Sequence, residues 1–406
     1  MSTTIQDAHP VLTTRPDFAR RAKAFEASPW AEAWDLVSSH PDPIYFGNGA
    51  PAREAQPLDR LREAGARAWT EADGILDYGE VEGYRPLREL IARRMARREM
   101  LVDPDEIMIT NGSQQGIDMV ARLMLDPGDQ IVVEGPAYIG AMQTFDAYEA
   151  SYVVAPIDED GLDVAALDRM LSATGARPKL IYTVPTFQNP TGITMTRARR
   201  EALLALARER GILVLEDDPY GELYYGDAPP QPLRALDPSV VYLGSFSKTI
   251  APGIRVGWTV APRHLMDLLL MAKEGADIHT GRVVTRTVFH TADGFLDDHI
   301  ATLRDLYRQR RDALLLGLER HLPPGTVWSC PGGGFFVWVQ LPAGLDADVL
   351  LPIAAAHGVA YLPGSWFYPA GHKEHSGLRL SFSSLPIDRI EEGTRRLGQA
   401  IAAVMG

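Results

Sequence analysis

The chain lacks the features of a secreted or membrane protein. Cys330 is its only cysteine, so no intrachain disulfide can form, which favours a reducing compartment such as the cytoplasm. No run of about 18 apolar residues is present, so no membrane-spanning helix is expected. The N-terminus also lacks the basic-then-apolar pattern of a secretory signal. We therefore expect a cytoplasmic protein with no membrane partner.

Positive charge is also scarce. The chain has 40 Lys and Arg residues against 53 Asp and Glu residues, which gives a formal net charge of −13. Nucleic acids and anionic membranes repel such a surface, so neither is expected as a partner. A local basic pocket for a small anion is compatible with this charge.

What the chain does have is enough length for a large core. Its 406 residues, 46% hydrophobic and 23% charged, suit two domains. Five near-continuous apolar runs predict parallel strands that are buried on both faces: residues 106–110, 130–134, 179–184, 212–216 and 240–244. Helical patterns lie between several of them, such as residues 114–125 and 197–210. Strand and helix in alternation predict an α/β domain with a mostly parallel sheet.

The C-terminal part follows a different pattern. A long helix is predicted over residues 300–321, and strands at 335–340 and 378–382 then mix with helices, as in a smaller α+β domain. Residues 1–43 carry no strand pattern and are predicted to form an N-terminal arm that joins the small domain. The predicted division is therefore an arm at 1–43, a large domain at 44–299 and a small domain at 300–406.

Four polar or glycine-rich clusters follow the predicted strands, where the ligands of such sheets bind. The first, residues 110–115, opens a helix with Gly112, Ser113 and Gln114. Free N–H groups and the helix dipole suit a phosphate there, and an ordinary helix cap is the alternative. The second, residues 187–192, contains Asn189, whose amide either points into the crevice or belongs to a simple turn.

The third cluster is a row of carboxylates, Glu216, Asp217 and Asp218, followed by Pro219 and Tyr220. Adjacent negative charges repel one another, so we expect a member of the row to have a cationic partner. A hard metal ion is an alternative partner. However, the run holds no histidine, and the Pro-Tyr that follows is unlike a metal loop. We therefore predict no metal.

The fourth cluster, residues 244–257, combines Ser245, Ser247, Lys248 and Arg255. It forms an anion site with one amine; a solvated loop lysine is the alternative, which the apolar neighbours disfavour. Together the four clusters require a ligand with a phosphate, a cationic ring nitrogen, an oxygen for Asn and Tyr donors, and a group that reacts with an amine. Pyridoxal 5′-phosphate (PLP) meets each requirement.

These residues also carry a family resemblance. The chain resembles fold-type I PLP enzymes of the class I aminotransferase group in Ser245-x-Ser247-Lys248-x6-Arg255, Asn189-Pro190-Thr191-Gly192, Asp217-x-x-Tyr220 and Arg379. It is most similar to the 2-aminoadipate/kynurenine aminotransferase branch, which it matches in residues 78–88, 112–115, 216–220, 244–248 and 272–277. The resemblance implies a three-layer PLP-transferase large domain with a mostly parallel sheet, and a smaller α+β domain.

The resemblance implies roles for individual residues at the cofactor ring. Lys248 would bind PLP as a Schiff base and shuttle the substrate proton, with a pKa lowered by burial and by the nearby phosphate clamp. Asp217 would pair with the ring nitrogen, while Asn189 and Tyr220 would hydrogen-bond the ring oxygen. Tyr138 would stack on the ring face, with a packed strand-end aromatic as the alternative.

Further implied contacts lie at the phosphate and the substrate. The phosphate ligands would be Gly112, Ser113, Gln114, Ser245, Ser247 and Arg255. Tyr78 would reach the phosphate across a subunit interface, so the resemblance implies a homodimer with active sites at that interface. Arg379 would hold the substrate carboxylate in a bidentate fork, beside Asn189 and Gly49. An exposed strand arginine is the alternative for Arg379.

Two segments depart from the pattern of this branch, and both lie on the substrate side. Residues 79–81 read Gly-Glu-Val, and residues 47–51 read Gly-Asn-Gly-Ala-Pro, which places the Asn48 amide on the substrate path. These departures do not affect the prediction of PLP binding, but they leave the identity of the substrate undecided.

Transamination between an L-α-amino acid and a 2-oxo acid, with 2-oxoglutarate as the expected acceptor, is the leading hypothesis. A specialised lyase, cyclase or oxidase of a biosynthetic pathway on the same scaffold is the alternative. A third hypothesis is the effector-binding part of a transcription regulator. Residues 1–43 are too few for an added DNA-binding domain, and the charge is too negative for one.

Overall fold

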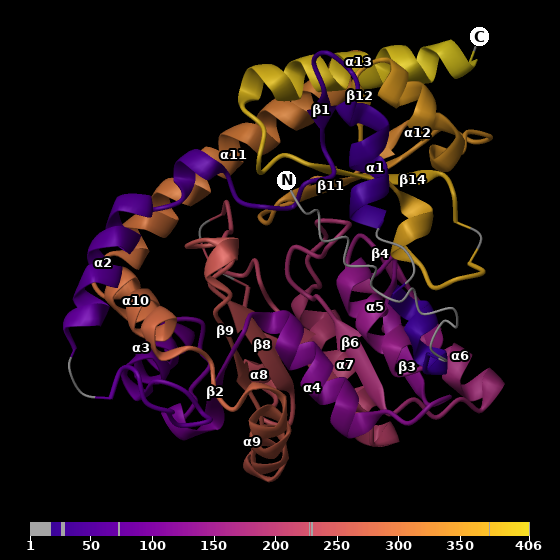
Figure 1. Cartoon of the computed structure of the whole chain (residues 1–406). Helices are drawn as coiled ribbons and strands as arrows, with labels where there is room; N and C mark the ends of the chain where they lie inside the picture. The colour runs from indigo at the N-terminus through magenta and orange to yellow at the C-terminus, as the bar shows by residue number, and fades with distance from the viewer. Residues whose placement is uncertain are drawn as a thin grey trace, which may run out of the picture.

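A computed structural model describes residues 18–25, 29–71, 74–226, 228, 230–372 and 374–405. Residues 1–17 and 26–28 of the predicted arm lie outside the described residues. Figure 1 shows a large sheet with helices on its faces and, above it, a smaller part formed by the C-terminal segment. Helix α11 (Leu296–His321) leads from one part to the other.

The large sheet has eight strands in the order β2-β9-β8-β7-β6-β3-β4-β5. The neighbouring strands β4, β3, β6, β7 and β8 pair in parallel. Strand β9 is antiparallel to β2 and β8, and β5 is antiparallel to β4. The strands are β2 (Ile107–Thr110), β3 (Gln130–Gly135), β4 (Ser151–Asp158), β5 (Gly161–Leu162), β6 (Leu180–Thr183), β7 (Leu213–Asp217), β8 (Val241–Ser245) and β9 (Gly257–Val260). The five predicted strands are present as β2, β3, β6, β7 and β8, and β4, β5 and β9 are additional to them. The predicted parallel pairing is confirmed for four of the five; β2 pairs only with β9, in the antiparallel direction.

Alternate residues of each strand face two different helical layers. Ile131 and Val133 of β3 lie in the same core cluster as α4, α5 and α9, whereas Val132 packs with α6 and α7. The helices are α3 (Arg85–Ala96), α4 (Ser113–Met124), α5 (Ile139–Ala147), α6 (Val164–Thr174), α7 (Arg197–Arg210), α8 (Leu233–Leu236), α9 (Arg263–Asp277) and α10 (Arg282–Ala292). This three-layer arrangement confirms the predicted fold class.

The smaller part contains an antiparallel sheet in the order β10-β11-β14-β13. Its elements after α11 are β10 (Val327–Trp328), β11 (Phe336–Gln340), α12 (Ala347–Ala356), β12 (Val359–Ala360), β13 (Leu362–Pro363), β14 (Gly377–Ser381) and α13 (Ile387–Met405). The predicted strands at 335–340 and 378–382 correspond to β11 and β14. Helix α11 packs along α13 and begins before the predicted boundary at residue 300.

The described part of the predicted arm contacts both parts of the molecule. The 3-10 helix η1 (Arg20–Phe25) packs on α5, whereas α1 (Pro29–Ser38) packs on α12 and β12. Strand β1 (Ile44–Tyr45) pairs in parallel with β12, so the chain stays with the smaller part as far as Tyr45. Helix α2 (Leu58–Thr70) then packs on α10. The division at residues 43 and 299 remains a prediction.

Short 3-10 helices complete the fold: η2 (Arg53–Ala55), η3 (Pro104–Glu106), η4 (Pro252–Ile254) and η5 (Gly364–Phe367). Within the described residues, no helix combines the length and the apolar character needed to cross a membrane.

Candidate active site

A cavity of about 270 Å³ lies at the carboxyl ends of the central strands and reaches the smaller part. It is lined by Asn48, Gly49, Ala50, Ser113, Gln114, Tyr138, Val184, Asn189, Asp217, Pro219, Tyr220, Ser245, Ser247, Lys248, Pro252, Arg255, Phe336 and Arg379. Twelve of the fourteen predicted site residues are therefore brought together, all except Gly112 and Tyr78. Gly112 lies behind the lining, and Tyr78 is an exposed residue whose ring lies 6.1 Å from that of His279.

Lys248 follows the end of β8 and points into this cavity. Its Nζ donates to the backbone oxygen of Gly49 at 3.0 Å and lies 5.9 Å from the centre of the Tyr220 ring. Burial is the main cause that lowers the pKa of Lys248 to about 8. The positive charges of Arg379 and Arg255 also lower this pKa, and Arg379 has the larger effect of the two. The predicted direction of the shift is thus confirmed, with burial as its main cause. A solvated loop lysine is excluded.

Asp217 ends β7 and is the only carboxylate of its row that lines the cavity. Its Oδ2 accepts a hydrogen bond from the Tyr182 hydroxyl at 2.9 Å, while its buried Oδ1 makes no hydrogen bond of good geometry among the described residues, although the Ser113 hydroxyl is close enough to help lower the pKa of Asp217. Burial raises the pKa of Asp217 to about 7, and the neighbouring Asp218 raises it as well. Such a group calls for a cationic or donating partner from within the cavity. Tyr182, on the adjacent β6, was not recognisable as a site residue from its apolar strand.

The other two carboxylates of the row point away, because successive strand residues face opposite sides. Asp218 pairs with Arg98 at 2.6 Å and accepts from the Tyr242 hydroxyl at 3.1 Å. Glu216 accepts from the backbone nitrogens of Leu233 and Arg234 at 2.8 and 2.9 Å. The row thus has two cationic partners: Arg98, paired with Asp218, and Arg200, whose Nη1 lies 3.9 Å from Glu216 Oε1.

A tight turn at residues 110–115, here called the phosphate turn, faces Arg255. Gly112 has φ +80°, and a Cβ at this position would lie 2.4 Å from Nη2 of Arg255, so the position requires glycine. Helix α4 begins within the turn, at Ser113, directly after Gly112, and its first N–H groups are unpaired. Behind the turn, a Cβ on Gly257 would lie 2.8 Å from the backbone nitrogen of Ser113, so β9 packs against the turn only through glycine.

Hydroxyl groups and Arg255 complete this side of the cavity. Ser245 Oγ donates to Ser247 Oγ at 2.8 Å and accepts from the backbone nitrogen of Ser247 at 3.0 Å. Arg255 adopts the left-handed region with φ +50°. The Gln114 amide donates instead to Gly140 O and Thr144 Oγ1 of α5, both at 2.7 Å. Gln114 therefore offers an incoming anion its backbone N–H rather than its amide.

Arg379 lies on β14 with its side chain buried, which excludes the exposed-arginine alternative. Its Nη1 donates to Asn189 Oδ1 at 2.9 Å and its Nη2 to Gly47 O at 2.6 Å. The guanidinium lies 4.2 Å from the Phe336 ring centre and 5.2 Å from that of Phe367. Burial lowers its pKa to about 10. Because the Asn189 oxygen is engaged, its amide NH₂ is the group that can donate into the cavity.

Two tyrosines line the cavity. The hydroxyl of Tyr138 donates to Gln114 Oε1 at 3.4 Å, and burial raises its pKa to about 12. Tyr220 packs edge-on against Phe335 and Phe336, at 5.5 and 5.7 Å between ring centres, and burial raises its pKa too. Both hydroxyls are therefore neutral donors near neutral pH.

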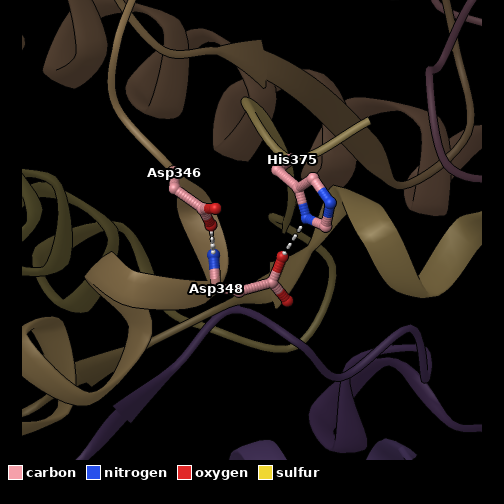
Figure 2. A group of neighbouring side chains, drawn as sticks. All are labelled: Asp346, Asp348 and His375. Atoms are coloured by element: carbon pink, nitrogen blue, oxygen red, sulfur yellow. Dashed lines mark hydrogen bonds and ion pairs between the residues drawn. The ribbon is translucent and has the colours of Figure 1, made fainter. Parts of the chain in front are cut away.

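A separate acidic cluster lies in the smaller part, outside the cavity. Figure 2 shows Asp346, Asp348 and His375, whose ligand atoms lie within 4.8 Å of one another. Asp346 caps α12 by accepting from the backbone nitrogens of Asp348 and Val349. Asp348 accepts from Ser365 Oγ at 2.7 Å and pairs with His375 Nδ1 at 3.0 Å. Helix capping and an ion pair account for this cluster, and the absence of a metal site stays a prediction.

The cavity was tested for its fit to PLP on these contacts. The orphaned Asp217 Oδ1 requires a donor such as a protonated ring nitrogen, and the phosphate turn with Arg255 suits a phosphate. Lys248 supplies a buried amine of lowered pKa between them. The residues fit, and fold and cavity together define a PLP-dependent enzyme of fold type I.

Comparison with known proteins narrows this class. Residues 41–397 match the family model of class I and II aminotransferases. Aromatic-amino-acid aminotransferase 1 of Thermococcus litoralis is 39% identical over 405 residues, which cover 98% of this chain and 96% of that protein. 2-Aminoadipate transaminase of Thermus thermophilus is 38% identical over 394 residues, covering 96% and 97%.

A solved structure shows the same likeness. Kynurenine aminotransferase of Pyrococcus horikoshii, in complex with PMP, with KYN as substrate and KYA as product, matches with a TM-score of 0.90 and 39% identity, covering 96% of this chain and 98% of that one. The chain belongs to the class I and II aminotransferases. It is a PLP-dependent aminotransferase, so the third hypothesis, a regulator module, is not retained.

Proposed function

We propose that this aminotransferase moves the amino group of an aromatic or long-chain L-α-amino acid to a 2-oxo acid, with 2-oxoglutarate as an acceptor. The observation that carries the proposal is the buried Arg379, which faces the same cavity as Lys248 and stacks on Phe336. A carboxylate fork beside an aromatic wall suits an α-amino acid with a large side chain. The names of the similar proteins, which include aromatic amino acids, 2-aminoadipate and kynurenine, support this range.

PLP, when bound, supplies an electron sink for the pair left on the substrate Cα after its proton is removed. Lys248 is proposed to hold the cofactor and then to carry that proton. Its lowered pKa supports this role, because an amine with a pKa near 8 is a base in a useful fraction of molecules near neutral pH. The hydrogen bond from Lys248 Nζ to Gly49 O, at 3.0 Å, supports a position of the amine beside the proposed substrate residues.

Asp217 is proposed to keep the ring nitrogen protonated. Its Oδ1 can accept a hydrogen bond from the protonated ring nitrogen, and the Tyr182 hydroxyl donates to its other oxygen, Oδ2. On the other side of the cavity, Asn189 and Tyr220 are proposed to donate to the ring oxygen, and Tyr138 to cover the ring face. Their neutral, buried donors support these roles.

The phosphate is proposed to bind the backbone N–H groups of Gly112, Ser113 and Gln114, together with Ser245, Ser247 and Arg255. Tyr78 is proposed to complete this site in a partner subunit, which makes the enzyme a homodimer. Tyr78 is 80% exposed, which supports an interface position for this large aromatic residue. A cytoplasmic location is proposed from the single cysteine.

The substrate carboxylate is proposed to bind Arg379, beside Asn189 and Gly49. Removal of water from this pocket by Phe336 and Phe367 strengthens the ion pair. Asn48, next to Gly49, lines the same cavity and is proposed to contact the substrate side chain.

The experiment is a half-reaction with a panel of L-amino acids and purified enzyme, without any 2-oxo acid. Aromatic donors, kynurenine and 2-aminoadipate are expected to convert the yellow absorbance of the lysine-bound cofactor to that of the amino form. Addition of 2-oxoglutarate should then restore the yellow form and yield glutamate. If turnover continues in the absence of a 2-oxo acid, a lyase, cyclase or oxidase is favoured instead. If only small donors react, the proposed side-chain range is wrong.

A further inference from the structure

A partly buried polar network, with Lys273 fully buried, lies behind the phosphate turn, and none of the roles above uses it. It joins Lys273 and Asp277 of α9 to Asn111 and Gln115, the residues on either side of Gly112–Gln114. The Lys273 side chain is 0% exposed and that of Asp277 22% exposed. Neither residue lines the cavity. The sequence motif at residues 272–277 thus lies outside the site and touches the turn that forms it.

The network holds the turn through several hydrogen bonds. Lys273 Nζ donates to both carboxylate oxygens of Asp277, at 2.9 and 3.0 Å, and to Gln115 Oε1 at 3.2 Å. Asp277 Oδ2 accepts from Asn111 Nδ2 at 2.5 Å and from Gln115 Nε2 at 2.8 Å. Gln115 Oε1 also accepts from the Asn111 backbone nitrogen at 2.8 Å. Helix α9 therefore fixes both ends of the turn.

Asn111 connects this network to the anion site. Its backbone oxygen accepts from Arg255 Nη2 at 3.2 Å, and its side chain is held by Asp277. The next residue, Gly112, leaves no room for a Cβ against that same guanidinium. A displacement of Asn111 would therefore move the turn and Arg255 relative to each other, and the two groups must keep their spacing to bind one anion.

The charges of the pair matter as well as its bonds. A carboxylate behind an anion site opposes anion binding, and Lys273 offsets the charge of Asp277. An ordinary ion pair between residues four apart stabilises its own helix and is usually exposed. Here the lysine is fully buried and the pair makes three hydrogen bonds to the turn, so its contacts reach beyond α9.

We propose that Lys273 and Asp277 are positioning residues that hold the phosphate turn, and that the preference of the enzyme for a phosphorylated cofactor depends on them. The proposal rests on the proposed phosphate site. Arg255 and the turn would bind the phosphate directly, while the pair acts only through Asn111 and Gln115. Loss of the pair should therefore weaken the binding of PLP and spare the binding of pyridoxal, which lacks the phosphate.

The test compares PLP and pyridoxal in titrations of the apoenzyme, followed by the yellow absorbance that Lys248 produces with either aldehyde. Asp277→Asn weakens the contacts of residue 277 with Asn111 and Gln115, but it also removes a negative charge that opposes anion binding. Because the two effects partly cancel, we expect the Kd for PLP to rise only about threefold. The Kd for pyridoxal should stay nearly unchanged. Lys273→Met should weaken PLP binding more than Asp277→Asn, because it leaves the Asp277 charge uncompensated behind the anion site.

Two further variants keep the outcome interpretable. Gln115→Met breaks the link to Lys273 and leaves both charges paired, so it replaces Lys273→Met as the test if that variant does not fold. It should also weaken the binding of PLP and leave the binding of pyridoxal nearly unchanged. Asp158→Asn breaks the 2.6 Å pair with Arg199, which does not line the cavity, and should leave both affinities unchanged.

Two results would overturn the proposal: a parallel loss of PLP and pyridoxal affinity in Asp277→Asn and Gln115→Met, or no loss of PLP affinity in either. The first would show a general structural role, and the second no role. A wild-type enzyme that binds pyridoxal as tightly as PLP would instead contradict the proposed phosphate site itself.

Discussion

The two sides of the cavity are built in different ways. The cofactor wall consists of Ser113, Asp217, Ser245, Ser247 and Lys248, which lie at or just after the ends of strands in the large sheet, and of Arg255, which lies between β8 and β9. The substrate wall consists of Asn48, Gly49, Phe336 and Arg379, which come from the segment after β1 and from strands of the smaller sheet.

The difference shows that residues of the substrate wall can change without loss of cofactor binding. Parallel neighbours β7 and β8 place Asp217 and Lys248 at one edge of the same sheet, so a local sequence pattern is enough to bring them together. The substrate wall depends instead on the pairing of β1 with β12 and of β11 with β14. Changes in the substrate wall should alter specificity and leave cofactor binding intact.

The largest expected effect is that of removing the amine from the cofactor wall. Lys248→Ala should lower kcat by on the order of 10⁴-fold, because the proton carrier is lost. It should also abolish the yellow, borohydride-reducible absorbance while the protein stays folded by circular dichroism. A reducible chromophore that persists in this variant would mean that another lysine binds the cofactor.

Asp217→Ala should lower kcat by roughly 10³-fold, since the ring nitrogen would lose the charge that keeps it protonated. The Kd for PLP should rise, and Asp217→Asn should behave alike because its amide carries no charge. Turnover and PLP titration measure the two effects. Near-normal turnover in either variant would overturn the assignment of Asp217 to the ring nitrogen.

On the substrate wall, Arg379→Lys keeps the charge and loses the planar fork. We expect kcat/KM for amino acids to fall about 100-fold, with the loss mainly in KM. The yellow absorbance and the Kd for PLP should match wild type, in contrast to the variants of the cofactor wall. A comparable loss of PLP affinity would mean that the two walls are not independent.

A pH effect tests the buried amine without substrate. Folding lowers the pKa of Lys248 from 10.5 to about 8, so below pH 8 the apoenzyme buries a charge at a cost of up to about 3 kcal/mol. Between pH 8 and 10.5 the unfolded chain binds more protons at this lysine, so apoenzyme stability should rise with pH. Urea unfolding of apo Lys248→Met should show higher stability at pH 7 and lack that rise. Equal pH slopes for the two proteins would contradict the shift.

The smallest expected effect belongs to Asn48→Gly. It should change the ratio of kcat/KM between aromatic and dicarboxylic donors by about five- to tenfold, the range of a single hydrogen bond. Absorbance and PLP affinity should stay unchanged. Uniform behaviour with every donor would show that Asn48 does not contact the substrate side chain.

The large sheet was accessible from the sequence because several of its strands are buried on both faces. The central strands β6 and β8 and the terminal strand β2 are buried along their whole length, and their sequences are nearly continuous apolar runs. Strand β4 is partly exposed at the sheet edge, and β9 is a short antiparallel strand beginning with glycine. Neither carries that signal.

Within the site, some contacts carry no sequence signal. Tyr182 occupies an apolar strand, and only its position on β6 beside β7 brings its hydroxyl to Asp217. Gly257 looks like an ordinary strand glycine until β9 packs against the phosphate turn. Lys273 and Asp277 form a helix-spaced pair, and the sequence does not say which side of α9 is buried against Asn111.

The sequence by itself determined the fold class and most of the cofactor wall, because Asp217, Ser245, Ser247 and Lys248 lie at the ends of neighbouring parallel strands, which meet at one edge of the sheet. The residues of the substrate wall were expected only from the family resemblance, and tertiary structure decided how they come together. Arg379 meets Asn189 and Gly47 across 190 and 332 residues of chain, through backbone pairings that no local pattern encodes. It also decided the support behind the phosphate turn, because a buried network depends on which faces of distant elements pack together.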